Sequence, residues 1–432
     1  MHHLFDKEGK RFLFDSNEIR LYRVPEKYKG IIDKNGIGDI NFNKREVNIQ
    51  IKDKDLNKCS KLVLIISKVC NLNCKYCYAS GGNYGDKESL MMDLETLMKS
   101  IEVTLDIFPK GIECIQFFGG EPLTNYKILR DGILFINELF KKRNLKKPNY
   151  TIVTNGTIIN EEIIEIFNDF FQSVTISLDG KKEINDYNRI FKNNNHSVHD
   201  SVIKNIELMN KSRPYLLDIE MTVDDKQIDY FISKNNIDNF KYIKTLKVDS
   251  VHMTPVIDCK NVMSDSEKRR KESRVKYFDL CIKESLKGKA KEINLVKAKS
   301  IIQILKNKII SEHFCSAGIS TITVDEKGNI YPCFMFGEVD EFVMSNINNF
   351  LQEDFNKIRQ KFIDNKIVNN NKCKTCWANT ICSEACSGCV GSFYLTNKNI
   401  SEVIDEHCDI GKSGLERVLY QVYEYSESKK LK

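Results

Sequence analysis

Six short apolar segments recur between residues 62 and 256, and longer intervals separate them. They are LVLIIS (62–67), ECIQFF (113–118), YTIVT (150–154), SVTISL (173–178), LLDIEMTV (216–223) and VDSVHMTPV (248–256). Runs of this length are typical of strands buried in a parallel sheet. Residues 94–108 fill the first interval with apolar side chains at helical spacing. The alternation predicts an α/β fold, either doubly wound or a partial (β/α)6 barrel of the TIM type, with its chemistry at the carboxyl ends of the strands.

The two ends of the chain do not follow this alternation. Residues 12–24 (FLFDSNEIRLYRV) predict two short strands around a polar turn, and a helix is expected over residues 25–32. After about residue 300 the chain is rich in cysteine and turn residues, and a last helix is expected over residues 411–427. We therefore predict three domains, 1–58, 59–300 and 301–432, and expect metal centres to serve as the core of the third.

Composition narrows the class of protein. The 432 residues are 41% hydrophobic and 29% charged, as in globular proteins, and the formal net charge of +6 is too small and too evenly spread to indicate nucleic acid. The longest apolar run falls far short of a membrane span, and no secretory leader opens the chain. We expect a cytoplasmic protein without membrane or nucleic-acid partners. Because a reducing cytosol does not keep structural disulfides, the fifteen cysteines indicate metal ligation.

Three of these cysteines follow the first predicted strand. Cys70, Cys74 and Cys77 have the spacing C-x3-C-x2-C, with the aromatic Tyr76 before the last. Three thiolates on a four-iron cluster leave one iron open for a small chelating ligand. A zinc site completed by a distant histidine is the alternative, and the chain has only seven histidines, none of them nearby.

This motif resembles the signature of the radical S-adenosylmethionine (SAM) enzymes. The resemblance implies that the open iron binds the methionine moiety of SAM, and that cleavage gives a 5'-deoxyadenosyl radical. FFGGEP (117–122) resembles the family's GGEP motif and implies that Gly119, Gly120 and Glu121 receive the methionine amino group. TNGT and SLDG follow the next two strands, so Asn155, Ser177 and Asp179 are candidates to bind the ribose. Arg189 resembles the arginine that pairs with the methionine carboxylate; a surface arginine is the alternative.

The last region resembles the SPASM extension of radical SAM enzymes, which holds two auxiliary four-iron clusters. Its seven-cysteine order is Cys315-x12-Gly328-x4-Cys333, then Cys373-x2-Cys376-x5-Cys382-x3-Cys386, then Cys408. The resemblance assigns an outer cluster to Cys373, Cys376, Cys382 and Cys408, and an inner cluster to Cys315, Cys333 and Cys386. Three 4Fe-4S clusters and SAM are thus the expected cofactors. A zinc ribbon is the alternative, although it uses paired C-x2-C knuckles.

Two departures from the family pattern bear on the reaction. Thr321 stands where sulfatase-maturing relatives have a fourth inner ligand, so the inner cluster either has an open iron or is closed by Cys389. Phe334 stands where those relatives have an acid that takes the second proton. No general base is therefore assigned, and the sulfatase interpretation is weakened.

The whole layout resembles the thioether-forming maturases of ribosomally made, cysteine-rich peptides (the ranthipeptide and sactipeptide type). The amino-terminal segment is then a small winged-helix-like module that binds a leader peptide as an added strand, or alternatively a cap on the barrel. The expected partners are a cysteine-containing precursor peptide and an electron donor such as flavodoxin or ferredoxin. The alternatives are formylglycine formation, a carbon–carbon crosslink, epimerisation, or a non-catalytic iron–sulfur or peptide-binding protein.

Overall fold

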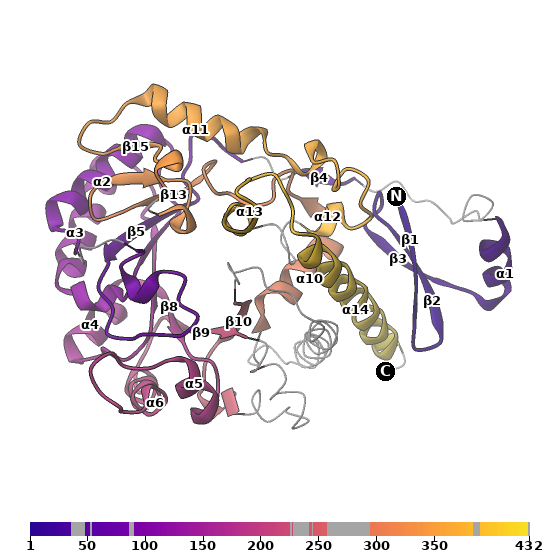
Figure 1. Cartoon of the computed structure of the whole chain (residues 1–432), viewed down its shortest axis with the longest axis horizontal. Coiled ribbons are helices and arrows are strands. Elements are labelled where there is room, and N and C mark those ends of the chain that lie inside the picture. The colour runs from indigo at the N-terminus through magenta and orange to yellow at the C-terminus, as the bar shows by residue number, and fades with distance from the viewer. Residues whose placement is uncertain are drawn as a thin grey trace.

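The computed structural model describes residues 1–35, 48–51, 54–85, 90–224, 227, 242–243, 245–256, 294–337, 339–382 and 389–430. The six predicted strands all form, and they lie in parallel in one sheet that curves into part of a barrel (Figure 1). They are β5 (Lys61–Ser67), β6 (Cys114–Gly119), β7 (Asn149–Thr154), β8 (Phe171–Ser177), β9 (Leu216–Val223) and β10 (Ser250–Pro255). The predicted α/β class and partial barrel are confirmed.

Helices lie along the outside of the curved sheet (Figure 1). They are α2 (Leu94–Ile107), α3 (Lys127–Lys142), α4 (Glu161–Phe170), α5 (Lys182–Asn188) and α6 (Val198–Met209). Three of them begin at a side chain that accepts a backbone N–H: Asp93 for α2, Asn160 for α4 and Ser197 for α6. These caps fix where each helix starts, and therefore how long the loop is that leaves each strand's carboxyl end.

The sheet continues beyond the predicted barrel on both sides. At one side β11 (Asn294–Leu295) pairs with β10. At the other, β13 (Thr321–Val324) pairs in parallel with β5, and β14 (Asn329–Tyr331) and β15 (Ser345–Asn346) follow in antiparallel order. The sheet order is therefore β11-β10-β9-β8-β7-β6-β5-β13-β14-β15. Strands of two to four residues give too weak a sequence pattern to be predicted.

The carboxy-terminal region packs by burial of apolar side chains, which corrects the expectation that metal centres would serve as its core. Phe336, Phe342 and Phe362 are each at most 2% exposed, and their rings contact one another. The region's helices are α10 (Val296–Asn307), α11 (Gln352–Asp364), α12 (Asn379–Cys382), α13 (Val390–Asn397) and α14 (Asp405–Lys430). Their buried side chains belong to the same core as those of the barrel.

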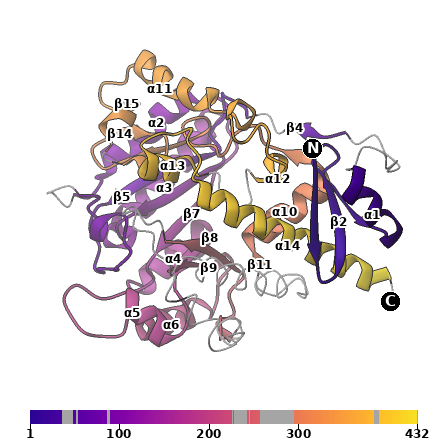
Figure 2. The same ribbon diagram turned by 45° about the vertical axis from the view of Figure 1, so that its right-hand side comes forward.

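The amino-terminal segment forms a three-stranded antiparallel sheet with a helix. Its elements are β1 (His2–Lys7), β2 (Lys10–Asp15), β3 (Arg20–Val24) and α1 (Glu26–Asn35). The two predicted strands and the helix form, and β1 is an addition. One face of the sheet packs on α14, where the ring of Phe12 meets those of Tyr420 and Tyr423 (Figures 1 and 2). The other face packs on α1 through a small separate core.

Two shorter features complete the described chain. β4 (Gln50–Ile51) pairs in parallel with β12 (Ile309–Ile310), and this pair ties the segment before the barrel to the carboxy-terminal region. Within the described residues, no helix is both long and apolar enough to cross a membrane.

Candidate functional site

The first cysteine group lies on the loop that leaves β5, at the carboxyl end of the sheet. Three glycines let the backbone close around this loop. A Cβ at Gly82 would lie 2.8 Å from Cys70 Cβ, and a Cβ at Gly120 would lie 2.7 Å from Gly82 Cα. A Cβ on Gly119 would lie only 2.1 Å from the Ser67 carbonyl oxygen. Any larger residue would therefore push the GGEP turn away from the cysteine loop.

Backbone N–H groups point at the sulfurs of this loop. Leu72 N–H donates to Cys70 Sγ over 3.4 Å, and Gly81 N–H donates to Cys77 Sγ over 3.3 Å. Burial, and then the carboxyl of Glu121, raise the pKa of Cys70 to about 12. Burial also raises the pKa of Cys74, and the positive charge of Arg189 lowers it in part. Buried thiols that accept hydrogen bonds from backbone N–H groups are stable as thiolates once they bind a metal cluster.

A four-iron cluster suits this donor set better than a single ion does. Among the described residues no three cysteine, histidine or acidic side chains gather closely enough for one metal ion. The corners of a cubane cluster hold its thiolates farther apart than the ligands of one ion. Three sulfurs on one glycine-lined loop, with backbone donors toward two of them, fit such a cluster.

Glu121 is fully buried at the turn after β6. Its Oε1 accepts the Leu123 N–H over 2.9 Å and the Thr154 hydroxyl over 2.6 Å, and its Oε2 accepts the Asn155 N–H over 2.7 Å. Burial raises the pKa of Glu121 to about 7, although these three hydrogen bonds lower it in part. A carboxylate offers about four acceptor positions. One position therefore stays available to an incoming ammonium group.

Asn155 connects the end of β7 to the cysteine loop. Its side-chain amide donates to Asn71 Oδ1 over 2.9 Å, and Asn71 in turn donates to the Thr157 hydroxyl over 2.8 Å. The Thr157 hydroxyl donates back to Asn155 Oδ1 over 2.6 Å, which closes the ring. Because these polar groups bond to one another, they fix the loop geometry. Whether Asn155 also binds ribose stays a prediction, as it does for Ser177 at the end of β8.

Asp179, Tyr76 and Arg189 form one buried group beside the cysteine loop. Arg189 donates from Nε and Nη2 to the two carboxylate oxygens of Asp179, over 3.1 and 3.0 Å. The Tyr76 hydroxyl donates to the same carboxylate over 2.5 Å. Arg189 is 6% exposed, so the alternative of a surface arginine is wrong. Two of its five donors are used by Asp179, and three remain for another anion.

The segment after α5 pairs with the cysteine loop along the backbone. Asn73 N–H donates to the Ile190 carbonyl over 2.7 Å, and Lys75 N–H donates to the Asn188 carbonyl over 3.0 Å. The position of Arg189 relative to the cysteines is therefore set by main-chain hydrogen bonds on either side of it.

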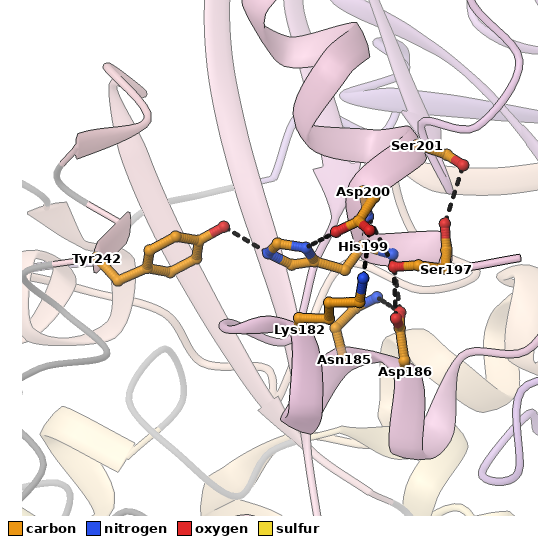
Figure 3. A network of polar contacts seen from close by, with 8 residues as sticks. All are labelled: Lys182, Asn185, Asp186, Ser197, His199, Asp200, Ser201 and Tyr242. Atoms are coloured by element: carbon orange, nitrogen blue, oxygen red, sulfur yellow. Dashed lines mark hydrogen bonds and ion pairs between the residues drawn. The ribbon is translucent and has the colours of Figure 1, made fainter.

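A second polar group braces α5 from outside and was not predicted (Figure 3). His199 lies between Asp200, 3.0 Å from its Nδ1, and Tyr242, 2.5 Å from its Nε2. The Ser197 hydroxyl donates to Asp186 over 2.5 Å and accepts the Asp200 N–H. Although serine, histidine and aspartate occur together, the Ser197 hydroxyl is engaged by Asp186 and by the first turn of α6. The group holds α5 to α6 and thereby supports the segment that carries Arg189.

The carboxy-terminal cysteines gather at two places. Burial, and then the thiols of Cys408 and Cys376, raise the pKa of Cys373 to about 11. Cys382 ends α12. At the second place, Gly318 N–H donates to the Pro332 carbonyl over 2.9 Å, which joins the segments that carry Cys315 and Cys333, and Cys389 Sγ lies 3.4 Å from Met335 Sδ. Cys386 lies outside the described residues.

Aromatic rings separate this second place from the radical loop. The ring centroid of Phe334, next to Cys333, lies 4.8 Å from that of Phe118, next to the GGEP glycines, and 6.2 Å from that of Tyr78, next to Cys77. Residues far apart in sequence thus form one wall between two cysteine groups. The sequence analysis noted Phe334 because it replaces an acid of the family pattern. It could not predict that Phe118 and Tyr78 would contact it.

One further pair escaped the sequence analysis. Lys68, two residues before Cys70, forms an ion pair with Glu326, which lies in the turn between β13 and β14. Both residues are buried, and they join the loop of the first strand to the carboxy-terminal region. A lysine and a glutamate in separate polar turns carry no pattern that would mark them as partners.

Comparison with known proteins agrees with this geometry. The model of the radical SAM superfamily matches residues 64–224. These residues form a radical SAM domain. The match spans β5 to β9, including the cysteine loop, the GGEP turn and Arg189, and the family implies SAM and a 4Fe-4S cluster. The prediction of a radical SAM domain is confirmed for these residues.

Two relatives show what this protein is similar to over most of its length. One is a cysteine-type anaerobic sulfatase-maturating enzyme of Clostridium novyi, 29% identical over 77% of this chain and 88% of that protein. Another is the radical SAM cyclopropyl synthase TigE of Paramaledivibacter caminithermalis, 24% identical over 98% of this chain and 84% of that protein. Both are enzymes.

A solved structure shares the fold. It is described as a histidine-tagged form of anSMEcpe with bound AdoMet, and it superposes with a TM-score of 0.70 at 20% identity, covering 85% of this chain and 96% of that one. The fold similarity therefore extends well beyond the radical SAM domain, into the cysteine-rich region.

Proposed function

We propose that this protein is a radical SAM peptide maturase that joins a cysteine sulfur to a carbon of the same ribosomally made precursor peptide. When bound, the cluster and SAM supply a 5'-deoxyadenosyl radical. The net change in the peptide is the loss of two hydrogens. One leaves with 5'-deoxyadenosine, and the other leaves as the thiol proton, which passes to solvent, and an electron. The electron goes to an iron–sulfur acceptor and from there to a carrier such as flavodoxin or ferredoxin.

The observation that carries the proposal is the position of Phe334. Its ring packs on Phe118 and Tyr78, so an aromatic wall stands where sulfatase maturases, by resemblance, have an acid. Formylglycine formation needs a group there that accepts the second proton, and a phenyl ring has none. Thioether formation adds no water to the peptide, and the apolar rings of Phe118 and Phe334 are compatible with it.

The radical loop has the residues that this role requires. Glu121 keeps an acceptor position for the methionine ammonium group, and Arg189 keeps donors for the methionine carboxylate. Tyr76, Asp179 and Asn155 hold these groups in place through hydrogen bonds. We assign SAM binding to this constellation, with Gly119 and Gly120 allowing close approach.

Two auxiliary clusters complete the proposal. The outer cluster is assigned to Cys373, Cys376, Cys382 and Cys408, and the effect of the Cys408 and Cys376 thiols on the pKa of Cys373 supports it. The inner cluster is assigned to Cys315, Cys333 and Cys386, next to the aromatic wall. The similarity to TigE spans 98% of this chain and so includes the segments that carry both cysteine groups, which supports a common layout.

The amino-terminal sheet is the proposed binding site of the leader peptide. Among the described strands none pairs with the outer edge of β3, and we assign the added strand of the leader peptide to this edge. The inner face packs on α14 and carries Phe12, which fixes the module against the rest of the protein.

The test is mass spectrometry of a cysteine-rich precursor peptide, encoded beside this gene and co-expressed anaerobically with the protein, after treatment with a thiol alkylator. Thioether formation lowers the mass by about two units for each thiol that no longer alkylates. A carbon–carbon crosslink also removes two hydrogens but leaves every thiol reactive. Epimerisation leaves the mass unchanged, and formylglycine formation removes the sulfur. Any of these last three products would contradict the proposal.

A further inference from the structure

Asn185 binds the backbone of both members of the Asp179–Arg189 ion pair. It lies in the middle of α5 and is fully buried. Its side-chain oxygen, Oδ1, accepts the Asp179 N–H over 3.1 Å. Its backbone carbonyl accepts the Arg189 N–H over 2.8 Å, where α5 ends. One residue therefore sets the spacing between the main chain that carries the carboxylate and the main chain that carries the guanidinium.

The helix α5 depends on contacts of this kind for its position. It has only seven residues, and its N-cap residue, Lys181, makes no side-chain cap bond. So short a helix is not stable by itself, and asparagine in a helix is less favourable than alanine. The bond between the Asp179 N–H and the Asn185 side chain ties α5 to the loop that leaves β8. Asn185 thus offsets its poor helix propensity by a tertiary contact.

The amide of Asn185 can take only one orientation. Its Nδ2 donates to Asp186 Oδ1 over 3.2 Å (Figure 3). Because a carboxylate only accepts hydrogen bonds, Nδ2 must face Asp186 and Oδ1 must face the Asp179 N–H. The Asp186 carboxylate also accepts the His199 N–H over 2.8 Å and the Ser197 hydroxyl over 2.5 Å, at the first turn of α6. The side chain of Asn185 is therefore held from two sides.

The Asp179 carboxylate is fully engaged by the protein. Its Oδ1 accepts Arg189 Nη2 and the Thr222 N–H, each over 3.0 Å. Its Oδ2 accepts Arg189 Nε over 3.1 Å and the Tyr76 hydroxyl over 2.5 Å. A carboxylate offers about four acceptor positions, so these four donors fill it. The carboxylate of Asp179 therefore orients Arg189, and a shift of the Asp179 backbone would move the guanidinium with it.

We propose that Asn185 is a positioning residue for SAM that acts through Arg189. By fixing the backbones of Asp179 and Arg189 relative to each other, it directs the remaining donors of the guanidinium toward the methionine carboxylate. This role rests on the proposed assignment of that carboxylate to Arg189, and it does not involve the peptide. Without the Asn185 side chain the ion pair can still form, but its position is less well fixed. Recognition of the carboxylate should then weaken, because such a bond depends on accurate placement.

The experiment compares SAM with decarboxylated SAM, which lacks the carboxylate that Arg189 is assigned to bind. Dissociation constants for both ligands are measured by anaerobic equilibrium dialysis on the reconstituted full chain and on its Asn185→Ala, Asn185→Asp and Arg189→Lys variants. Asn185→Asp keeps an acceptor for the Asp179 N–H but has no donor for Asp186. Melting temperature and iron content show whether each variant folds and holds its clusters.

Asn137→Ala is the matched control. Asn137 is also a helical asparagine, in α3, and its Oδ1 accepts the Tyr150 hydroxyl over 2.9 Å. Tyr150 lies near the start of β7, away from the carboxyl ends of the strands where the cysteine loop lies. The substitution removes a comparable hydrogen bond at a place that does not touch Arg189. It should lower the melting temperature without changing the preference for SAM over decarboxylated SAM.

Asn185→Ala should weaken SAM binding about three- to tenfold, as expected for one lost hydrogen bond, and leave the affinity for decarboxylated SAM within about twofold of the wild type. Asn185→Asp should keep most of the preference for SAM. If Asn185→Ala does not fold, Asn185→Ser takes its place, since the serine side chain ends one bond short of the asparagine oxygen. Equal losses for the two ligands, no loss in a folded alanine or serine variant, or an equally large loss in Asn185→Asp would overturn the proposal.

Arg189→Lys separates this proposal from the one on which it rests. A selective loss of SAM affinity in Arg189→Lys, with none in Asn185→Ala, would refute the role of Asn185 alone. An Arg189→Lys protein that loses both ligands equally would refute the assignment of the methionine carboxylate to Arg189, and the role of Asn185 with it. No peptide is present in these measurements, so thioether formation is tested separately.

Discussion

Lys68 Nζ lies 3.0 Å from Glu326 Oε1, and both side chains are only 1% exposed. Burial, and then the neighbouring Asp325, raise the pKa of Glu326, while Lys68 lowers it in part. A buried charge without its partner is costly, whereas a buried pair replaced by two apolar residues often costs little. This ion pair therefore holds the loop after β5 to the carboxy-terminal region.

Replacing Lys68 by methionine should destabilise the protein by about 3–5 kcal/mol, because Glu326 is left charged and buried. The double variant Lys68→Met, Glu326→Leu should recover most of this loss. Melting temperatures measured anaerobically check the prediction. Lys110→Ala is the matched control, since its pair with Asp55 is exposed and should contribute no more than about 1 kcal/mol. Equal effects at the two sites would show that the buried pair has no special role.

Glu121→Gln should weaken SAM binding by about ten- to a hundredfold, since a hydrogen bond to a charged group contributes about 1.5–3 kcal/mol. With a pKa of about 7, the carboxyl of Glu121 is charged above that pH and neutral below it. SAM affinity should therefore fall as the pH decreases through 7, and this dependence should be lost in Glu121→Gln. Anaerobic equilibrium dialysis measures both. The exposed Glu113→Gln serves as the control, and a wild-type-like affinity in Glu121→Gln would refute the assigned role.

Arg189→Lys should lose SAM affinity and stability together. Lysine keeps the charge but cannot make the two parallel bonds to Asp179 and still present donors to a second anion. Tyr76→Phe removes one hydrogen bond to the same carboxylate and should cost less, about 1–3 kcal/mol of stability. Melting temperature and SAM dissociation constant, measured on both variants, separate the two effects. Unchanged SAM binding in a folded Arg189→Lys protein would limit Arg189 to a structural role.

Alanine at Cys70, Cys74 and Cys77 should remove roughly four irons per chain and abolish 5'-deoxyadenosine formation. Iron analysis and chromatography of the reductive reaction give the two readings. Cys59→Ala provides a comparison, because Cys59 is fully buried and is not assigned as a cluster ligand. Continued 5'-deoxyadenosine formation by the triple variant would rule out this loop as the site of SAM cleavage.

Phe334→Ala should raise the amount of 5'-deoxyadenosine formed per crosslinked peptide several-fold. Without the ring, the wall that joins Phe118 to Tyr78 is broken, and solvent reaches the reaction. Phe334→Tyr keeps the ring and should stay near the wild-type ratio. The ratio is obtained by quantifying both products in one anaerobic reaction. A ratio unaffected by Phe334→Ala would mean that the wall does not shield the peptide.

Much of the barrel could be predicted because buried parallel strands read as continuous apolar runs. β5, with six of its seven residues buried, is such a strand. The cysteine loop was placed correctly because it follows directly after that strand. A motif that follows a buried strand directly can be placed from the sequence, because the strand fixes its position.

Features that combine residues from distant segments could not be predicted from the sequence. The pair of Lys68 and Glu326 depends on β13 lying beside β5, and β13 is too short to stand out. Arg189 was expected to face a ligand, and the structure adds that Asp179 already binds it. For Cys389, spacing leaves two alternatives open, an open iron or closure by Cys389, and Cys386 lies outside the described residues.

The chain has a single tryptophan, Trp377, and it follows Cys376 directly. Its ring lies flat against that of His3 in the amino-terminal sheet, with centroids 3.9 Å apart and planes 1° from parallel. The intrinsic tryptophan fluorescence of the whole protein therefore originates at one junction, between β1 and the outer cysteine group. Any shift of the amino-terminal sheet will change that emission, so the native protein carries its own optical reporter of movement at this contact.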